Sequence, residues 1–315
     1  MCLRKAAAWR QTVEETSRIT MEVSIIIRTY NEARDVRRCL EAMLKQDFDR
    51  PFEIVIVYNT DSTDNTLEIV QSMGLKVVKK GHYNAGENIN FGIKNSDGKY
   101  LVISSAHCYP VDSHWLSNLY RNFSDPEVAG VYGKQVIPDS AKPMARRQVS
   151  AVYNDSWRSS RDNPVISNVN CMIRRDVWEK HQYDESPGNV VEDICWGMKV
   201  QEMGYKIVYE PKAAMVHYHN DGLRGYCRRS RSEGYGLMYA GLYAHPLRSI
   251  LATLVKDTLA DALYLLSHPR YICWLPYAPL WRISRSFGLY AGMRAFQRDG
   301  RKPLFKASAK RLWKH

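Results

Sequence analysis

The stretch VSIIIRTYNEARDVRRCLEAMLKQ, residues 23–46, decides the fold of this chain. It begins with a continuous apolar run, VSIII, which is typical of a strand buried on both faces of a sheet. A polar turn follows, and apolar residues then recur at positions 36, 40, 43 and 44, which is helical spacing. FEIVIVYN (52–59) and TDNTLEIVQSMG (63–74) repeat the strand and the helix. This alternation predicts parallel β-α-β units in a doubly wound α/β sheet.

Polar residues follow several of the expected strands. Further strands are expected at 75–80, 100–106, 129–138, 165–175 and 206–219, with a helix at 84–96 and a loop running into a helix at 185–205. Ligands of doubly wound sheets bind beyond the carboxyl ends of the strands. We therefore expect the polar turns at 29–32, 59–61 and 105–107 to line one binding site.

Composition and charge limit the class of protein. A chain of 315 residues with 45% hydrophobic and 25% charged residues is expected to fold into one large domain or two small ones. The net charge of +12 lies entirely in the last third, because residues 222–315 hold 17 Lys and Arg against 4 Asp and Glu. Such a segment is expected to meet a polyanion, either an anionic membrane surface or nucleic acid, or to be a solvated basic face.

The cysteines, the lack of a long apolar run and the first 20 residues give three further expectations, on the redox compartment, on membrane spans and on the N-terminus. Seven scattered cysteines without a C-x-x-C pair indicate a reducing compartment. A membrane-spanning helix is not expected, since no run of about 18 apolar residues occurs. Residues 1–20 make a poor signal peptide and are expected to be a poorly ordered N-terminal extension.

Taken in order, several motifs resemble family 2 glycosyltransferases, enzymes of the GT-A fold that move a sugar from a nucleotide diphosphate to an acceptor hydroxyl. The motifs are the run at 23–70, Gly86, Asn90 and Gly92, SAH (105–107), NVNCMIRRDVWE (168–179), VEDICW (191–196) and VHYH (216–219). The resemblance implies a mostly parallel GT-A sheet flanked by helices at 21–221. Its nucleotide-binding half would be at about 21–110 and its acceptor half at about 111–221. A helical, basic and aromatic extension would follow at 222–315.

The resemblance also implies a nucleotide site. Its residues would be Thr29, Tyr30, Glu32, Asn59, Asp61, Asn90, Ser105 and His107. Asn59 stands where the family usually has an aspartate that accepts an N–H of the base, and an amide can both accept and donate. The base therefore stays open, cytosine included, and Asp61 is the alternative carboxylate. The competing interpretation is that Asn59 serves the turn and that Glu32 merely begins a helix.

VEDICW is the catalytic motif that the resemblance implies, with Asp193 as general base. A sugar hydroxyl is a weak nucleophile unless its proton is removed during attack. One carboxylate on the acceptor side fits single displacement with inversion, and Glu192 would orient Asp193 or raise its pKa. The alternative is that both acids only stabilise a helix amino terminus.

Members of the family usually hold Mg²⁺ or Mn²⁺ with an Asp-x-Asp pair, where this chain has Ser105 and His107. Imidazole suits Mn²⁺ better than Mg²⁺, and His217 and His219 are the further candidate ligands. In the alternative, activity is metal-independent and His107 contacts the diphosphate directly, with Arg228 and Arg229. Arg28 and SAHCYP (105–110) resemble a subgroup from bacterial surface-polysaccharide synthesis. Glu87 departs from the basic residue expected there.

The last third adds a membrane prediction. Trp274, Tyr277, Trp281, Phe287 and Tyr290 alternate with Arg282, Arg285 and Arg294. Such helices suit the interface of an anionic bilayer, and the alternative is that the aromatics pack back on the domain.

We expect a cytoplasmic enzyme, peripheral to the inner face of the cell membrane, with a nucleotide-sugar donor and a glycan or polyprenyl-linked acceptor. Nucleic acid is not expected as a partner, because no binding motif accompanies the charge. The alternative function is a non-catalytic nucleotide-sugar or glycan-binding protein of the same fold.

Overall fold

The computed structural model of the chain describes residues 21–82, 84–154, 165–186, 191–242 and 246–305. Within these, one sheet has the strand order β3-β2-β1-β4-β7-β6-β8-β5. The strands are β1 (Val23–Thr29), β2 (Phe52–Asn59), β3 (Lys76–Lys80), β4 (Tyr100–Ser105), β5 (Tyr109–Pro110), β6 (Val128–Val136), β7 (Asn170–Arg174) and β8 (Lys206–Val216). The helices are α2 (Val36–Leu44), α3 (Thr66–Ser72), α4 (Ala85–Lys94), α5 (Trp115–Tyr120), α6 (Pro143–Val152), α7 (Arg175–Lys180), α8 (Glu192–Glu202), α9 (Leu223–Tyr239), α10 (Pro246–Leu266) and α11 (Tyr277–Arg298), with 3₁₀ turns at Arg121–Ser124 and Pro269–Trp274.

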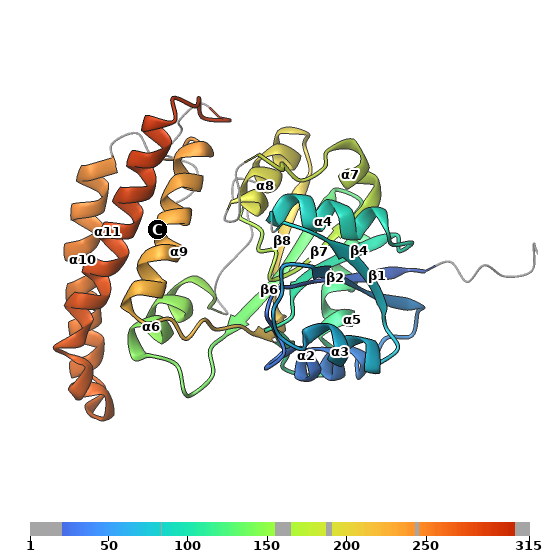
Figure 1. Cartoon of the computed structure of the whole chain (residues 1–315), viewed down its shortest axis with the longest axis horizontal. Coiled ribbons are helices and arrows are strands. Elements are labelled where there is room, and N and C mark those ends of the chain that lie inside the picture. The colour runs from blue at the N-terminus through green and yellow to red at the C-terminus, as the bar shows by residue number, and fades with distance from the viewer. Residues whose placement is uncertain (1–20, 83, 155–164, 187–190, 243–245, 306–315) are drawn as a thin grey trace, which may run out of the picture.

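Helices cover both faces of the sheet (Figure 1). Along β1, Val23, Ile25 and Ile27 pack with α2, α3 and α5 on one face, whereas Ile26 packs with α4 on the other. The apolar run therefore fills two cores, as a strand buried on both faces must. Four of the seven strand pairs are parallel. The predicted α/β fold with a mostly parallel sheet is confirmed.

The direction of the strands brings distant parts of the chain to one edge of the sheet. β4 runs parallel to β1, and β7 runs antiparallel to both β4 and β6. Ser104, at the end of β4, therefore lies opposite Asn170, at the start of β7. β6 and β8 are parallel and end near the same edge. The residues that follow β1, β4 and β8 and those that precede β7 are thus brought together.

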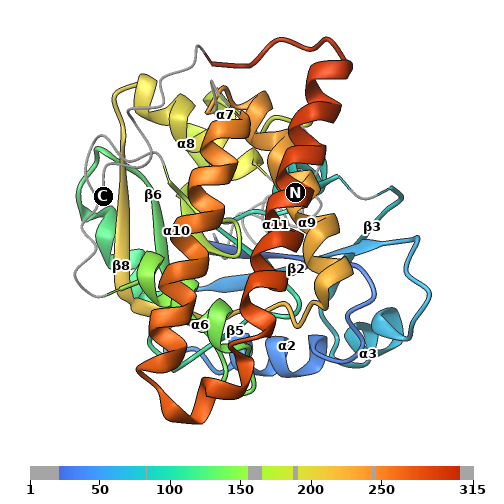
Figure 2. The same ribbon diagram turned by 90° about the vertical axis from the view of Figure 1, so that its left-hand side faces the viewer.

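The three last helices form a helical arm, defined here as α9 to α11. α9 lies against the sheet domain, and α10 and α11 form the outer layer (Figures 1 and 2). Glycines allow α9 and α11 to approach closely: a methyl group on Gly292 would lie 1.9 Å from the Arg231 carbonyl oxygen, and one on Gly288 would lie 2.3 Å from that of Cys227. The helices of the arm are therefore held to one another through close backbone packing.

The arm corrects part of the membrane prediction. Trp281 and Arg282 are only 2% and 1% exposed, and Arg285 is paired with Glu233 rather than presented to a membrane. Phe287 and Tyr290 are exposed as predicted. The 3.6-residue period of α11 turns Trp281 and Arg282 inward and Phe287 outward, so the alternative of inward packing holds for part of the set. None of the helices in the described part of the chain is long and apolar enough to cross a membrane.

Candidate active site

Arg28, the last residue but one of β1, lies at the centre of the site. Its Nη2 donates to Ser105 Oγ at 3.2 Å and to the carbonyl oxygen of Asn168 at 3.1 Å. Its Nη1 lies 3.7 Å from Glu192 Oε1, and both side chains are buried. Ser105 is thus a partner of Arg28, which links the end of β4 to the acid pair.

The acid pair begins α8. Asp193 Oδ1 accepts from the Ile194 N–H at 2.8 Å, and Oδ2 accepts from the Asn168 N–H at 3.4 Å. Asn168 Nδ2 also donates to Glu192 Oε1 at 3.2 Å. Glu192 Oε2 is buried and has no hydrogen-bond partner within the described residues. One amide residue therefore holds both carboxylates.

Asp193 has the electrostatics of a base that works near neutral pH. Its burial, followed by the negative charge of Glu192, raises the pKa of Asp193 to about 7. Hydrogen bonds from the N–H groups of Ile194 and Asn168 and the positive charge of Arg28 oppose that rise. A helix amino terminus alone would stabilise the charged form, so burial and the like charge outweigh it here.

Three histidines converge at the same edge of the sheet as this pair. The ring centroids of His107, His217 and His219 lie 4.7 to 5.3 Å apart, and the Nε2 atoms of His217 and His219 are 3.1 Å apart. His107 Nδ1 lies 2.8 Å from Glu32 Oε1, and His217 Nδ1 lies 2.9 Å from Gln135 Oε1. His107 Nε2 is buried, with no hydrogen-bond partner among the described residues. We call His107, His217 and His219 the histidine cluster.

Two of the three histidines, His107 and His217, have ligand atoms close enough together to hold a divalent metal, with Cys108 as the third member of that group; His219 is not a member of it. Burial, followed by the neighbouring imidazoles, holds the pKa of His217 well below its usual range and lowers the pKa of His219 to about 4. Neutral imidazoles keep a lone pair for a metal, and ring nitrogens anchored to Glu32 and Gln135 fix the ligand orientation. Cys108 Sγ lies within 4.8 Å of ligand atoms of His107 and His217. Burial raises the pKa of the Cys108 thiol, which makes it the poorer ligand.

The other predicted nucleotide residues lie around the first two strand ends. Tyr30 is exposed, while Thr29 is buried and donates to the Val57 carbonyl oxygen at 3.3 Å. Asn59 is fully buried, and its Oδ1 accepts from the Asp61 N–H at 2.9 Å. Through this bond Asn59 stabilises the turn after β2, as in the competing interpretation given above. Asp61 is exposed, so its carboxylate is the more accessible of the two.

Asn90 makes its side-chain hydrogen bonds within the protein. Its Oδ1 accepts from Trp178 Nε1 at 2.9 Å and from the Tyr183 N–H at 3.1 Å. Its Nδ2 donates to the Tyr183 carbonyl oxygen at 2.8 Å and to Glu185 Oε1 at 3.0 Å. A primary amide has two donors and two acceptor lone pairs, so its capacity is filled within the protein. Asn90 thus anchors the segment around Tyr183, and its role in nucleotide binding stays a prediction.

A pocket of about 130 Å³ joins the histidine cluster to the helical arm. Its lining includes His217, His219, Gln148, Tyr226, Arg229 and Trp281. Arg229 is paired with Asp221 at 2.8 Å, and its guanidinium lies over the Tyr226 ring. Arg228 is exposed and is not part of this lining. Of the two predicted arginines, only Arg229 therefore lies beside the histidine cluster.

Sequence reasoning missed three residues that position the site: Asn168, Tyr183 and Gln135. Tyr183 donates its hydroxyl to Asn168 Oδ1 at 2.9 Å, and Gln135 orients His217. Arg28 had a recognisable signal, because a charge at the end of a buried strand needs a buried partner. Asn168 begins the motif at 168–179, whereas Tyr183 and Gln135 had no signal, since their partners lie on other elements.

Comparisons with known proteins agree with this geometry. The family model described as glycosyl transferase family 2 matches residues 24–182, and that described as glycosyl transferase family group 2 matches residues 110–290. A solved structure with the same fold is the mannosyltransferase PcManGT from Pyrobaculum calidifontis, in complex with GDP-Man and Mn²⁺. It has a TM-score of 0.59 at 18% identity and covers 93% of this chain and 94% of that one. The fold and the site define a GT-A glycosyltransferase.

Since the family models match half of the sequence or more, the chain belongs to glycosyl transferase family 2. Among curated relatives, the dolichyl N-acetyl-α-D-glucosaminyl phosphate 3-β-D-2,3-diacetamido-2,3-dideoxy-β-D-glucuronosyltransferase of Methanococcus voltae is 27% identical, covering 67% of this chain and 71% of the relative. The O-antigen chain rhamnosyltransferase RfbN of Salmonella typhimurium is 25% identical, covering 64% and 67%. The expected family and enzyme class are confirmed.

Proposed function

We propose that this enzyme is an inverting glycosyltransferase of surface-polysaccharide synthesis that transfers a sugar from a nucleoside diphosphate to a glycan hydroxyl. The observation that carries the proposal is Asp193, a half-buried carboxylate with a raised pKa at the edge of the sheet that also holds the histidine cluster. The names of the relatives support the pathway class. The name of the Methanococcus relative, with its dolichyl phosphate, supports an acceptor carried on a lipid.

In the proposed reaction, Asp193 accepts the proton of the acceptor hydroxyl while the acceptor oxygen forms a bond to the anomeric carbon. The bond from that carbon to the diphosphate oxygen breaks on the opposite face, and its electron pair leaves with the diphosphate. A base with a pKa near the working pH suits this transfer, because it is deprotonated before attack and still basic enough to take the proton. Asn168 and Arg28 hold the pair in place.

The leaving diphosphate gains negative charge, which has to be stabilised. We propose that His107, His217 and His219 hold a divalent metal, with Mn²⁺ preferred over Mg²⁺ because the donors are imidazoles. Such a metal would supply Lewis-acid stabilisation of the diphosphate oxygens. In the metal-independent alternative, His107 and Arg229 contact the diphosphate themselves. Arg229 lies in the same pocket as His217 and His219, which supports either arrangement.

A thermal-shift screen with UDP, GDP, CDP and dTDP and their sugars, with and without Mn²⁺, tests the proposal. A donor present at about 100 times its Kd stabilises the fold by about 2.7 kcal/mol, a shift of about 4 °C for a chain of this length. We expect Mn²⁺ to enlarge the shift in wild type and His114→Ala, but not in His219→Ala. His114 is an exposed histidine outside the cluster.

Each outcome of the screen decides one part of the proposal. If no nucleotide sugar raises the melting temperature, the donor proposal is wrong. A donor shift without any effect of Mn²⁺ selects direct contact by His107 and Arg229. Donor binding without release of nucleoside diphosphate in the presence of glycan acceptors would favour the non-catalytic binding protein.

A further inference from the structure

The outer helix α10 has its apolar side turned to solvent. Val255, Leu259 and Leu263 are 61%, 60% and 69% exposed, and Leu247, Leu251 and Leu266 are also exposed. Five of these six residues, from Leu247 to Leu263, recur every four positions and therefore form one stripe along the helix. A helix of a soluble protein normally buries such a stripe. In α10, this apolar stripe faces solvent instead.

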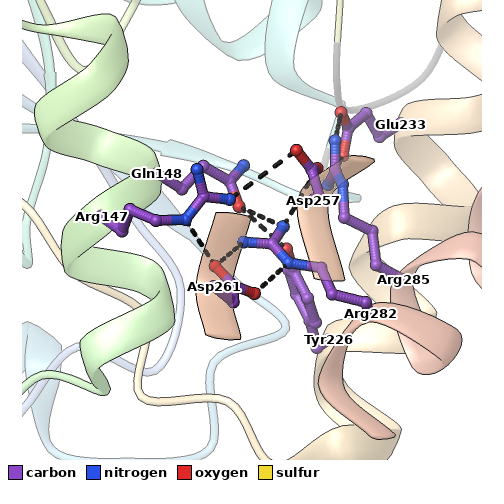
Figure 3. Close-up of polar contacts among 8 residues, drawn as sticks. All are labelled: Arg147, Gln148, Tyr226, Glu233, Asp257, Asp261, Arg282 and Arg285. Carbon is purple, nitrogen blue, oxygen red and sulfur yellow. Dashed lines mark hydrogen bonds and ion pairs between the residues drawn. The ribbon is translucent and has the colours of Figure 1, made fainter. Parts of the chain in front are cut away.

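The inner side of α10 explains why this orientation is stable. Asp261 is fully buried and accepts from Arg282 Nε at 2.5 Å and from Arg147 Nε at 2.5 Å. Asp257 pairs with the same two arginines at 3.4 and 3.7 Å. Figure 3 shows these side chains converging from α6, α10 and α11. Because two acids and two arginines balance inside, rotating α10 to bury its leucines would expose this network and break it.

The neighbouring helix α11 extends the apolar surface. Figure 2 shows α10 and α11 side by side at the front of the arm. On α11, Leu280, Ile283 and Phe287 are 51%, 53% and 66% exposed. Apolar surface continuous over two helices is larger than the scattered exposure normal for a soluble protein, and such patches mark sites of interaction. We call the exposed apolar side chains of α10 and α11 the outer face.

The charge around the outer face is almost entirely positive. The exposed basic residues between 246 and 305 are Arg248, Lys256, Arg270, Arg294, Arg298, Arg301 and Lys302. Among the described side chains of this segment, Asp299 is the one exposed acid, because Asp257 and Asp261 are turned inward and pair with Arg282. Long basic side chains can lie along an apolar surface and extend their charge to its edge.

We propose that the outer face lies in the interface of an anionic bilayer, with α10 and α11 parallel to the membrane plane. Leucine, isoleucine and phenylalanine side chains would enter the boundary of the acyl chains, and the surrounding lysines and arginines would meet lipid phosphates. A second copy of the chain is the less suitable occupant, because a symmetric contact would bring two basic rims together.

The position of the outer face gives it a role in the proposed reaction. The opposite side of the arm supplies Tyr226, Arg229 and Trp281 to the pocket that also holds His217 and His219. The membrane surface is thus separated from the reaction site by the arm alone. This role, though not the membrane binding itself, rests on the proposed function, since a lipid-linked acceptor would be presented at that surface.

Flotation of the full chain with vesicles tests the proposal, using phosphatidylcholine alone or mixed with phosphatidylglycerol. The test variant is Leu251→Gln/Leu259→Gln/Leu263→Gln. The matched control is Leu44→Gln/Val111→Gln/Met203→Gln, which changes three exposed apolar residues of the sheet domain. We expect wild type and control to float with the anionic vesicles, and the test variant to show a roughly 100-fold lower partition coefficient. Lys256→Gln/Arg248→Gln should reduce binding about 30-fold.

Several results would overturn the proposal. One is wild-type protein that does not float with either kind of vesicle. Another is equal loss of binding in the test variant and the control. A third is a wild-type dimer, measured by light scattering without lipid, that becomes a monomer only in the test variant; the outer face would then be a contact between copies. Since flotation requires no sugar transfer, it can fail while the proposed activity holds, and transfer to a water-soluble acceptor should persist in the test variant.

Discussion

The protein contains two buried clusters of opposite charges that differ in how fully their members are paired. In the arm, Asp261 uses both carboxylate oxygens, and Arg282 contacts them at 2.5 and 3.0 Å. In the site, Arg28 and Glu192 are 3.7 Å apart, and Glu192 Oε2 has no hydrogen-bond partner in the described part of the chain. The closely paired cluster of the arm joins helices. In the loosely paired cluster of the site, an oxygen of Glu192 is left without a hydrogen bond from the residues that the structure describes, and the neighbouring carboxylate of Asp193 has a raised pKa. Such a group is suited to proton transfer.

The largest effect is expected at Asp193. Asp193→Asn removes the base but preserves the shape of the side chain, so kcat should fall about 10³- to 10⁴-fold. Donor affinity, measured by calorimetry, should change less than about threefold, because the proposed role of Asp193 is to act on the acceptor hydroxyl. Glu202→Gln, at the other end of α8, is the matched control and should keep wild-type turnover. Unchanged kcat in Asp193→Asn would remove Asp193 from the mechanism.

The ion pairs of Asp257 and Asp261 with Arg147 and Arg282 form the arm cluster. Replacing one aspartate of this cluster by asparagine should lower the stability of the protein. Asp261→Asn leaves two arginines facing one remaining aspartate, and the free energy of unfolding should fall by about 3–5 kcal/mol. Asp299→Asn, at an exposed acid of the same arm, should lower it by less than about 1 kcal/mol. Urea denaturation followed by circular dichroism measures both. Equal stability of the two variants would show that the arm cluster contributes nothing net.

A smaller effect tests the packing that carries the arm. Gly292→Ala places a methyl group 1.9 Å from the Arg231 carbonyl oxygen, so the helices must separate, at a cost of about 1–3 kcal/mol. Gly225→Ala is the matched change on α9, where the methyl group would meet only the Asp221 side chain. It should be neutral or slightly stabilising, because alanine favours helix. Melting temperatures should separate the two variants, and coincident values would contradict the close packing.

The comparison also shows what the sequence could predict. The run at 23–27 and the helical period after it led to the correct fold, because burial on both faces leaves a local pattern. Asp193, Glu192 and the histidines were predicted from motifs that resemble the family, and their roles stay predictions. Asn168 and Tyr183 were missed, and the hydrogen bonds that Asn90 makes within the protein were not foreseen, because these bonds join residues far apart in the chain. Likewise, nothing local indicates that Arg282 faces Asp261 inside the arm while the leucines of α10 face outward.

The most direct test of the central claim is the pH dependence of kcat/KM for wild type and Glu192→Gln. Asp193 acts as a base only when deprotonated, so wild-type kcat/KM should rise with pH, with a midpoint at about 7, and level off above it. Glu192→Gln removes a negative charge that raises the pKa of Asp193, so the midpoint should move to lower pH. A wild-type profile that is flat from about pH 5 to pH 8, or a midpoint unmoved in Glu192→Gln, would contradict the account.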